Sequence, residues 1–227
     1  MPLNKQRGNM YPWITHTWNP IRGCLHRCTY CYVKSMPNYN SRPRLVEKEL
    51  KYSLGEDNTI FVGSASDMFG DWIPDDWIKK VLERTHRFYN TYLFQTKNPV
   101  RFAEFYDLFP YKTILGTTIE TNRDYKVSHA PSFEKRVEWM QKMSMGTHIF
   151  NGEPFDTMVS IEPIMQFDLK ELVYGISAIR PKFISAGADS KGHKLPEPSY
   201  EEVRELLRVL RKFTEVRVKN NLGRLLQ

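Results

Sequence analysis

The sequence predicts an α/β fold in which parallel strands form a partial (β/α)6–7 barrel of the TIM type. Short runs rich in β-branched and aromatic residues alternate with stretches of helical periodicity along the chain. This alternation is typical of parallel strands that are joined by right-handed crossovers. No GxGxxG sequence follows the first expected strand, so a barrel is favoured over a dinucleotide-binding, doubly wound sheet.

Seven β-rich runs are expected to be the strands of this barrel. They are residues 13–18, 59–63, 91–95, 113–118, 157–161, 182–186 and 215–218. Helical patterns lie between them at residues 74–90, 99–108, 132–143, 168–179 and 199–213. No internal repeat, low-complexity segment or linker divides the sequence, so residues 1–227 are expected to form a single domain.

Two of the expected helices begin with recognisable signals. Pro74 is followed by two aspartates, and both residue types are favoured in the first helical turn. Ser199, with Glu202 three residues later, is typical of a capping box. Apolar residues then recur at helical spacing, at Val203, Leu206, Leu207 and Leu210.

Polar residues follow five successive strands at the point where each is expected to end. They are Ser64, Ser66 and Asp67, then Gln95, Thr96 and Lys97, then Thr117, Thr118 and Glu120, then Ser160 and Glu162, and finally Asp189. Any one of them alone could be a helix cap or a turn residue. Because the carboxyl ends of the strands face the active site in α/β barrels, their recurrence predicts a site for a polar ligand there.

Composition and charge limit the partners of the protein. The chain has 33 basic and 26 acidic residues, and the net charge of +7 favours a polyanion such as a nucleic acid or nucleotide without defining a function. A small neutral or cationic molecule is the open alternative.

No stretch approaches the roughly 20 apolar residues that span a membrane, and the first ten residues lack the apolar core of a signal peptide. We therefore expect a cytoplasmic protein with no membrane partner.

All three cysteines lie within eight positions, as Cys24, Cys28 and Cys31. An odd number at this spacing argues against a disulfide set and favours metal binding. Three thiolates would leave one iron of a [4Fe–4S] cluster without a protein ligand, so this iron could bind a small molecule. Zinc, with His26 or His16 as a fourth ligand, is the alternative, although no second pair of cysteines is present.

The cysteine motif, with Tyr30 before the last cysteine, resembles the signature of the radical S-adenosylmethionine (SAM) superfamily. Five further motifs resemble a phage-associated group within it: TWNP at 17–20, SASDMF at 64–69, TKNP at 96–99, GTTIE at 116–120 and SIEP at 160–163. The resemblance implies a partial TIM barrel that binds a [4Fe–4S] cluster in a loop at 19–35. The segment GADS at 187–190 departs from the pattern, which puts the role of Asp189 in doubt.

The resemblance also implies where SAM binds. Ser64, Ser66 and Asp67 would meet its amino group, and Tyr30 would lie near its adenine. Thr117 and Glu120 would meet the ribose, and Lys97 would bind either the SAM carboxylate or a substrate phosphate. Glu162 completes the expected set at the strand ends.

The cysteine count implies limits on the reaction. Since no cysteine is left to donate a hydrogen atom, Tyr30 and Tyr32 are candidate donors. An external electron donor such as flavodoxin or ferredoxin is implied. The segment 189–198, with Lys191, His193 and Lys194, is either a lid or a plain surface loop.

Two functions from different classes follow. The first is an enzyme that cleaves SAM reductively and uses the resulting 5′-deoxyadenosyl radical to abstract hydrogen from a substrate. The second is a zinc-stabilised nucleic-acid-binding protein without catalysis. The second leaves the carboxylates at the strand ends unexplained, because carboxylates repel phosphate.

Overall fold

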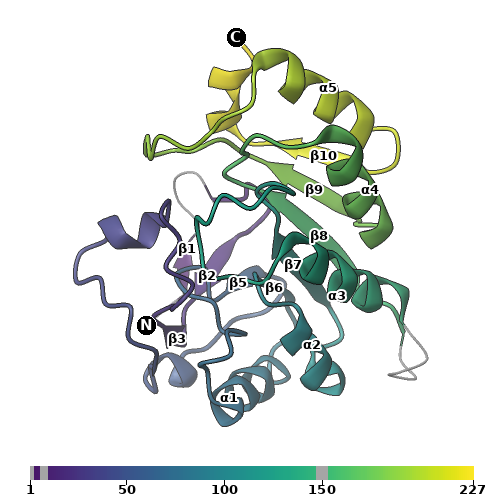
Figure 1. The fold of residues 1–227 in the computed structure, drawn as a ribbon. Helices are drawn as coiled ribbons and strands as arrows, with labels where there is room; N and C mark the ends of the chain where they lie inside the picture. The colour runs from purple at the N-terminus through teal and green to yellow at the C-terminus, as the bar shows by residue number, and fades with distance from the viewer. Residues whose placement is uncertain (1–2, 6–9, 147–152) are drawn as a thin grey trace.

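A curved sheet of eight strands organises the protein. In this computed structural model, which describes residues 3–5, 10–146 and 153–227, the strand order is β1-β2-β5-β6-β7-β8-β9-β10. All neighbouring strands are parallel except β1 and β2. The order has two ends, so the sheet is an open, partial barrel (Figure 1), and the predicted α/β fold is confirmed.

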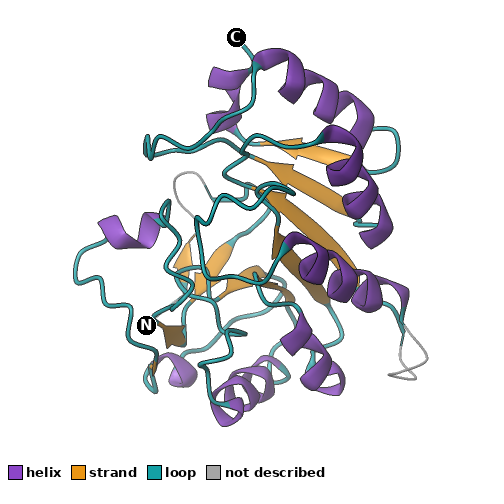
Figure 2. Cartoon of the chain, in the orientation of Figure 1, coloured by secondary structure: helices purple, strands orange, loops and turns teal. Residues whose placement is uncertain are grey.

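The strands alternate with helices as the sequence pattern predicts. The sheet contains β1 (Asn4–Lys5), β2 (His16–Trp18), β5 (Thr59–Val62), β6 (Thr91–Thr96), β7 (Thr113–Thr118), β8 (Asp156–Ile161), β9 (Phe183–Ala186) and β10 (Glu215–Val218). The helices are α1 (Asp75–Thr85), α2 (Val100–Glu104), α3 (Phe133–Met145), α4 (Leu169–Ile179) and α5 (Tyr200–Leu210). They cover the outer face of the curved sheet (Figure 2).

The two faces of the sheet carry different apolar clusters, because successive strand residues point to opposite sides. Ile60, Val62 and Phe94 belong to the large core between sheet and helices. Phe61 and Leu93 face the other way, into a smaller cluster inside the barrel. This inner cluster also contains Met158 and Phe183, and it is completed by Tyr11 and Ile14 from the segment before β2.

Several predicted elements have different bounds in the structure, and three of them are instructive. The strand expected at 13–18 begins only at His16, because the preceding residues turn, with Ile14 N–H donating to Tyr11 C=O. The helix expected at 74–90 ends at Thr85, and the chain then turns before β6, where the Asn90 side chain donates to Gly55 C=O. The helix expected at 99–108 divides at Phe105, whose φ of −122° is not helical.

Several short elements accompany the main strands and helices. Strands β3 (Ile21–Arg22) and β4 (Arg44–Leu45) form a small antiparallel pair. The part of the chain that the structure describes also contains four 3-10 helices: η1 (Tyr32–Ser35), η2 (Glu49–Lys51), η3 (Tyr106–Leu108) and η4 (Asn220–Leu225). The capping box predicted at Ser199 and Glu202 is confirmed at the start of α5. Within the described residues, none of the helices has the length and apolarity needed to cross a membrane.

Candidate functional site

The three cysteines lie on a loop between β3 and η1, beside the carboxyl ends of the strands. Gly23 begins this loop with a φ of +86° and forms a parallel bridge with Ser66, in the turn after β5. A Cβ at this glycine would lie 2.2 Å from the carbonyl oxygen of Arg42. Only glycine therefore allows the loop to pass so close to the β4 strand.

The far side of the loop is held by the segment that follows β7. Thr29 N–H donates to Val127 C=O at 2.9 Å, and His129 N–H donates to His26 C=O at 2.7 Å. Because both bonds join backbone groups, they fix the path of the loop independently of side-chain identity. The loop is thus anchored to two strand ends of the barrel.

All three cysteines are free thiols, as a thiolate cluster site requires. Cys28 is buried, whereas Cys24 and Cys31 are partly exposed. Burial, followed by the charge of Asp67, raises the pKa of Cys24 to about 12. Burial also raises the pKa of Cys28. Without a metal both side chains therefore stay protonated at neutral pH, and iron binding would displace their protons.

Across residues 3–5, 10–146 and 153–227, no three His, Cys, Asp or Glu side chains are grouped to bind a single metal ion. His26, one of the two histidines considered as a fourth zinc ligand, instead bonds Asp67 through Nε2. A cubane cluster makes a different demand, since each cysteine binds a different iron. Three thiols on one loop fit that demand.

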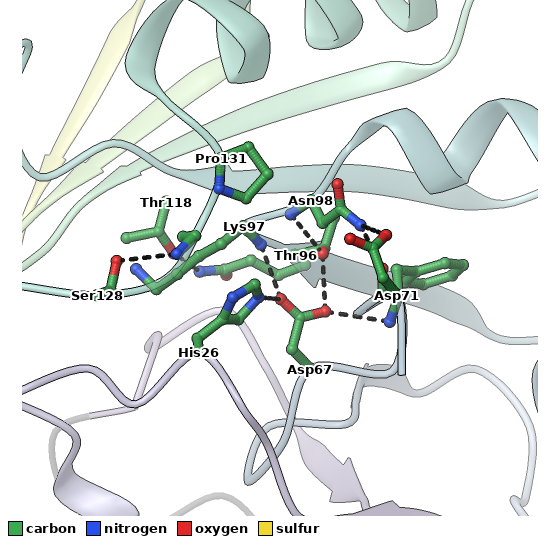
Figure 3. Close-up of polar contacts among 12 residues, drawn as sticks. His26, Asp67, Asp71, Thr96, Lys97, Asn98, Thr118, Ser128 and Pro131 are labelled. Carbon is green, nitrogen blue, oxygen red and sulfur yellow. Dashed lines mark hydrogen bonds and ion pairs between the residues drawn. The ribbon is translucent and has the colours of Figure 1, made fainter. Parts of the chain in front are cut away.

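Asp67, which follows β5, is buried and accepts four hydrogen bonds from protein groups (Figure 3). Oδ2 accepts from His26 Nε2 at 2.8 Å and from Lys97 N–H at 2.9 Å. Oδ1 accepts from the Thr96 hydroxyl at 2.7 Å and from Phe69 N–H at 3.1 Å. Although burial raises the pKa of Asp67, these bonds and His26 hold it below its usual value. The carboxylate thus ties the cysteine loop to the end of β6.

Glu120, just after β7, is the centre of a buried charge network. Arg136 of α3 donates to Oε2 at 2.7 Å, while the Lys97 ammonium and the Tyr30 hydroxyl both reach Oε1. Burial raises the pKa of Glu120, but the charges of Lys97 and Arg136 outweigh it and hold the pKa well below its usual value. Tyr30, inside the cysteine motif, is therefore connected directly to the ends of β6 and β7.

A second cluster of polar side chains lines the inside of the barrel. Its central residue, Tyr11, was not predicted from the sequence. The Tyr11 hydroxyl lies 2.9 Å from both Gln95 Oε1 and Ser160 Oγ. Gln95 also donates to the hydroxyl of Thr118. Burial, and then Glu162, raise the pKa of Tyr11, so the phenol stays neutral. No local pattern marks Tyr11, because its partners are 84 and 149 residues away.

The remaining predicted residues are placed as follows. The hydroxyls of Ser66 and Thr117 donate to the carbonyls of Ile21 and Thr96, and the hydroxyl of Ser64 lies 3.3 Å from the side chain of Asn19. Tyr32 donates to Ser64 C=O at 2.6 Å, beside the cysteine loop.

Glu162, at the end of β8, bonds residues that follow β10. Lys219 Nζ lies 2.7 Å from one carboxylate oxygen, and Asn221 Nδ2 lies 3.0 Å from the other. A Cβ at Gly187 would lie 2.8 Å from this carboxylate, so glycine permits the close approach. Glu162 thus joins the ends of β8, β9 and β10.

Asp189 caps its own loop. Its carboxylate accepts from Lys191 N–H at 3.0 Å and contacts His193 Nδ1 at 2.7 Å. Burial raises the pKa of Asp189, but bonds from Lys191 and His193 bring it below its usual value. A cavity of about 640 Å³ adjoins this loop, lined by Lys194 and Arg224 among others.

Comparison with known proteins identifies the family. Residues 9–195 match the family model described as "Protein of unknown function (DUF5131)". The chain belongs to the DUF5131 family. The DUF5131 match includes the cysteine loop and the strand ends from β5 to β9. No curated protein matches the chain.

Solved structures of spore photoproduct lyase share the fold. One mutant of that enzyme, with bound AdoMet and dinucleoside spore photoproduct, has a TM-score of 0.66 at 15% identity. The enzyme complexed with dinucleoside spore photoproduct has a TM-score of 0.63, also at 15% identity. Both comparisons cover 94% of this chain and 78% of the other. The DUF5131 chain and these enzymes therefore have a common fold.

Proposed function

We propose that this protein is a radical SAM enzyme that acts on a nucleic acid or nucleotide. One observation carries the proposal. Three free cysteines lie on one loop at the strand ends of a partial barrel, and spore photoproduct lyase, a structure with this fold, has AdoMet bound. A [4Fe–4S] cluster and SAM are the implied cofactors, and the resemblance to the phage-associated group stays a prediction.

Cys24, Cys28 and Cys31 would hold the cluster. When bound, it would supply the electron that cleaves SAM into methionine and a 5′-deoxyadenosyl radical, which then takes a hydrogen atom from the substrate. The electron would come from an external donor such as flavodoxin or ferredoxin. The protein would orient SAM and shield the radical from water. We infer a cytoplasmic location, which would keep the thiols reduced.

The geometry divides the proposed SAM ligands into two groups. Tyr30, Lys97 and Glu120 are mutual partners, so each would exchange a protein contact for one with SAM on binding. The side-chain oxygens of Asp67 and Thr117 already form hydrogen bonds with other protein groups. They would act by positioning the cysteine loop and the end of β6. Ser64, Ser66 and Glu162 complete the proposed set at the other strand ends.

The proposed hydrogen donors differ in setting. Tyr30 donates its hydroxyl hydrogen to Glu120, and burial, followed by the Glu120 charge, raises its pKa well above the usual value. Tyr32 is 41% exposed. The partial burial of Tyr32, and then the charge of Cys31, raise the pKa of Tyr32 to about 12. Both phenols therefore keep their hydrogens at neutral pH.

Anaerobic reconstitution tests the proposal. The wild-type protein should bind about four irons per chain, in keeping with one cubane cluster. Each single Cys→Ala variant should lose the cluster, whereas Thr29→Ala, an exposed side chain in the same loop, should keep it. With dithionite and SAM, only the clustered proteins should form 5′-deoxyadenosine. A colourless protein with one zinc would instead support the non-catalytic alternative.

A further inference from the structure

The whole net charge of the chain resides in its first fifth. Residues 1–46 contain seven Lys or Arg and no Asp or Glu, whereas residues 47–227 contain 26 basic and 26 acidic residues. The cysteine loop lies within this basic part. An uncompensated charge in one segment produces a local positive field, which the same number of scattered charges would not.

The structure shows that these cations also lack carboxylate partners. Among the described residues, Arg27, Lys34, Arg42 and Arg44 form no ion pair with a carboxylate, and only Arg22 does so, with Glu49. Elsewhere, pairing is common: Arg101, Arg123, Arg136, Arg208, Arg217 and Arg224 all contact carboxylates. Lys97, expected to bind either the SAM carboxylate or a substrate phosphate, is paired with Glu120. The excess of positive over negative charge therefore lies in the segment that contains the cysteines, and most of its described cations have no carboxylate partner.

Exposed rings accompany the unpaired cations. Tyr32 and Tyr39 are 41% and 43% exposed, and Met36 between them is 43% exposed. The Tyr32 hydroxyl is fixed on Ser64 C=O, so its ring stays beside the cysteine loop. Cations that bind phosphates, together with aromatic faces on which bases stack, are what single-stranded nucleic acids require.

This surface directly adjoins the proposed cluster. Lys34 Nζ donates to the carbonyl of Cys28 at 2.8 Å, and Tyr32 follows Cys31 in the chain. In Figure 1 the segment after the cysteines is the blue-violet loop that stands outside the sheet, on the open side of the barrel. A strand held on this loop would lie next to the site where the radical forms.

We propose that residues 27–44, the basic loop, bind single-stranded nucleic acid. Its assignment as the substrate surface rests on the proposed function, but its binding activity does not. An acidic electron-donor protein is a different partner for a basic surface. The exposed tyrosines favour nucleic acid, because base stacking uses aromatic faces whereas a charge-steered protein encounter does not require them.

Binding of a fluorescent 12-nucleotide single strand, measured by anisotropy at several salt concentrations, tests the proposal. The test variant is Arg27→Gln with Arg42→Gln, both exposed side chains. The matched control is Arg87→Gln with Arg211→Gln, which removes two exposed arginines from outside the basic loop. Loss of two phosphate contacts should make the slope of log affinity against log salt shallower by about 1.4. The control should keep the wild-type slope.

Tyr39→Ala provides a second variant that leaves the charge and the cysteine loop untouched. Loss of one stacked base should weaken binding by roughly 5- to 100-fold, with an unchanged salt slope. Equal affinities and slopes for all variants and the control would overturn the proposal. The proposal would also be overturned if the arginine variant bound the oligonucleotide as well as the wild type but its cluster were reduced more slowly by flavodoxin. Iron content and 5′-deoxyadenosine formation, measured separately, report on the proposed function.

Discussion

At the scale of single residues, two carboxylates of the candidate site accept hydrogen bonds from other residues of the protein. Asp67 and Glu120 are both buried, and both hold groups from the cysteine motif, namely His26 and Tyr30. A buried carboxylate is stable only when its charge is compensated and its oxygens accept hydrogen bonds. These two residues therefore couple the cysteine loop to the barrel, whatever ligand the site binds.

Glu120→Gln should destabilise the protein, because it leaves the buried Arg136 and the partly buried Lys97 without their counter-charge. Loss of one partner from a buried ion pair costs about 3–5 kcal/mol. The pKa of Glu120 is depressed in the folded state, so its contribution is complete above the usual carboxylate pKa of about 4.3 and is lost as pH falls below it. Urea denaturation at pH 7 and pH 3 should therefore show a larger difference between wild type and variant at pH 7. A difference that does not change with pH would contradict this role.

His26→Ala should also destabilise the protein, since it removes a hydrogen bond to the charged Asp67. Such bonds contribute about 1.5–3 kcal/mol. His129→Ala is the matched control, because His129 is exposed and contributes to the loop through its backbone N–H, which alanine retains. Thermal denaturation of the metal-free proteins measures the effect independently of iron. Equal melting temperatures for the two variants would show that the His26–Asp67 bond contributes no stability.

At the scale of elements, the cysteine loop depends on the antiparallel pair β3–β4 and on the turn after β5. Gly23 lies where these three segments meet, and its positive φ and close approach to Arg42 both require glycine. The geometry of the cysteines thus depends on a backbone contact with Arg42, which lies 11 to 18 residues after them in the chain. No cysteine spacing by itself specifies that contact.

Gly23→Ala should disrupt the loop for two reasons. The φ of Gly23 is positive, and the new Cβ would collide with the carbonyl of Arg42. Gly192 is the matched control, because its φ of +70° is similar but a Cβ there would meet no atom within 4 Å. Gly192→Ala should cost about 1–2 kcal/mol for the left-handed conformation. Gly23→Ala should cost more and should lower the iron content after reconstitution. If both variants have the same stability and iron content, the close contact at Arg42 does not shape the cysteine loop.

At the scale of the whole molecule, one large apolar cluster extends from Trp18 to Leu222 and includes residues of every helix from α1 to α5. The single domain expected from the sequence stays a prediction, and a continuous core among the described residues is what it requires. The net charge, unlike the apolar core, is confined to one part of the chain. Most of the barrel is electrically balanced, whereas the segment that carries the cysteines is basic.

A single core predicts cooperative unfolding. Urea denaturation followed by far-ultraviolet circular dichroism and by tryptophan fluorescence should give the same midpoint, as expected for a two-state domain. The tryptophans report on different regions, since Trp18 is in β2 and Trp139 is in α3. Two separated transitions would contradict the single domain and show that part of the barrel unfolds independently.

Local patterns determined much of this protein. The alternation of strands and helices predicted the α/β fold, and each of the seven predicted strands overlaps an observed strand. The predicted boundaries were less accurate where side chains bond distant groups, as Asn90 does in the turn between α1 and β6. The capping box at Ser199 was predictable because all of its partners lie within three residues.

The sequence alone also determined which residues could bind a cluster, since the spacing of Cys24, Cys28 and Cys31 is a local property of the chain. Only the tertiary structure decided what the strand-end residues do in the folded protein. Asp67 meets His26 across 41 residues, Glu120 meets Tyr30 across 90, and Tyr11 meets Ser160 across 149. Burial and hydrogen bonding of charged groups depend on which segments the fold brings together, and a linear pattern of residue types does not contain that information.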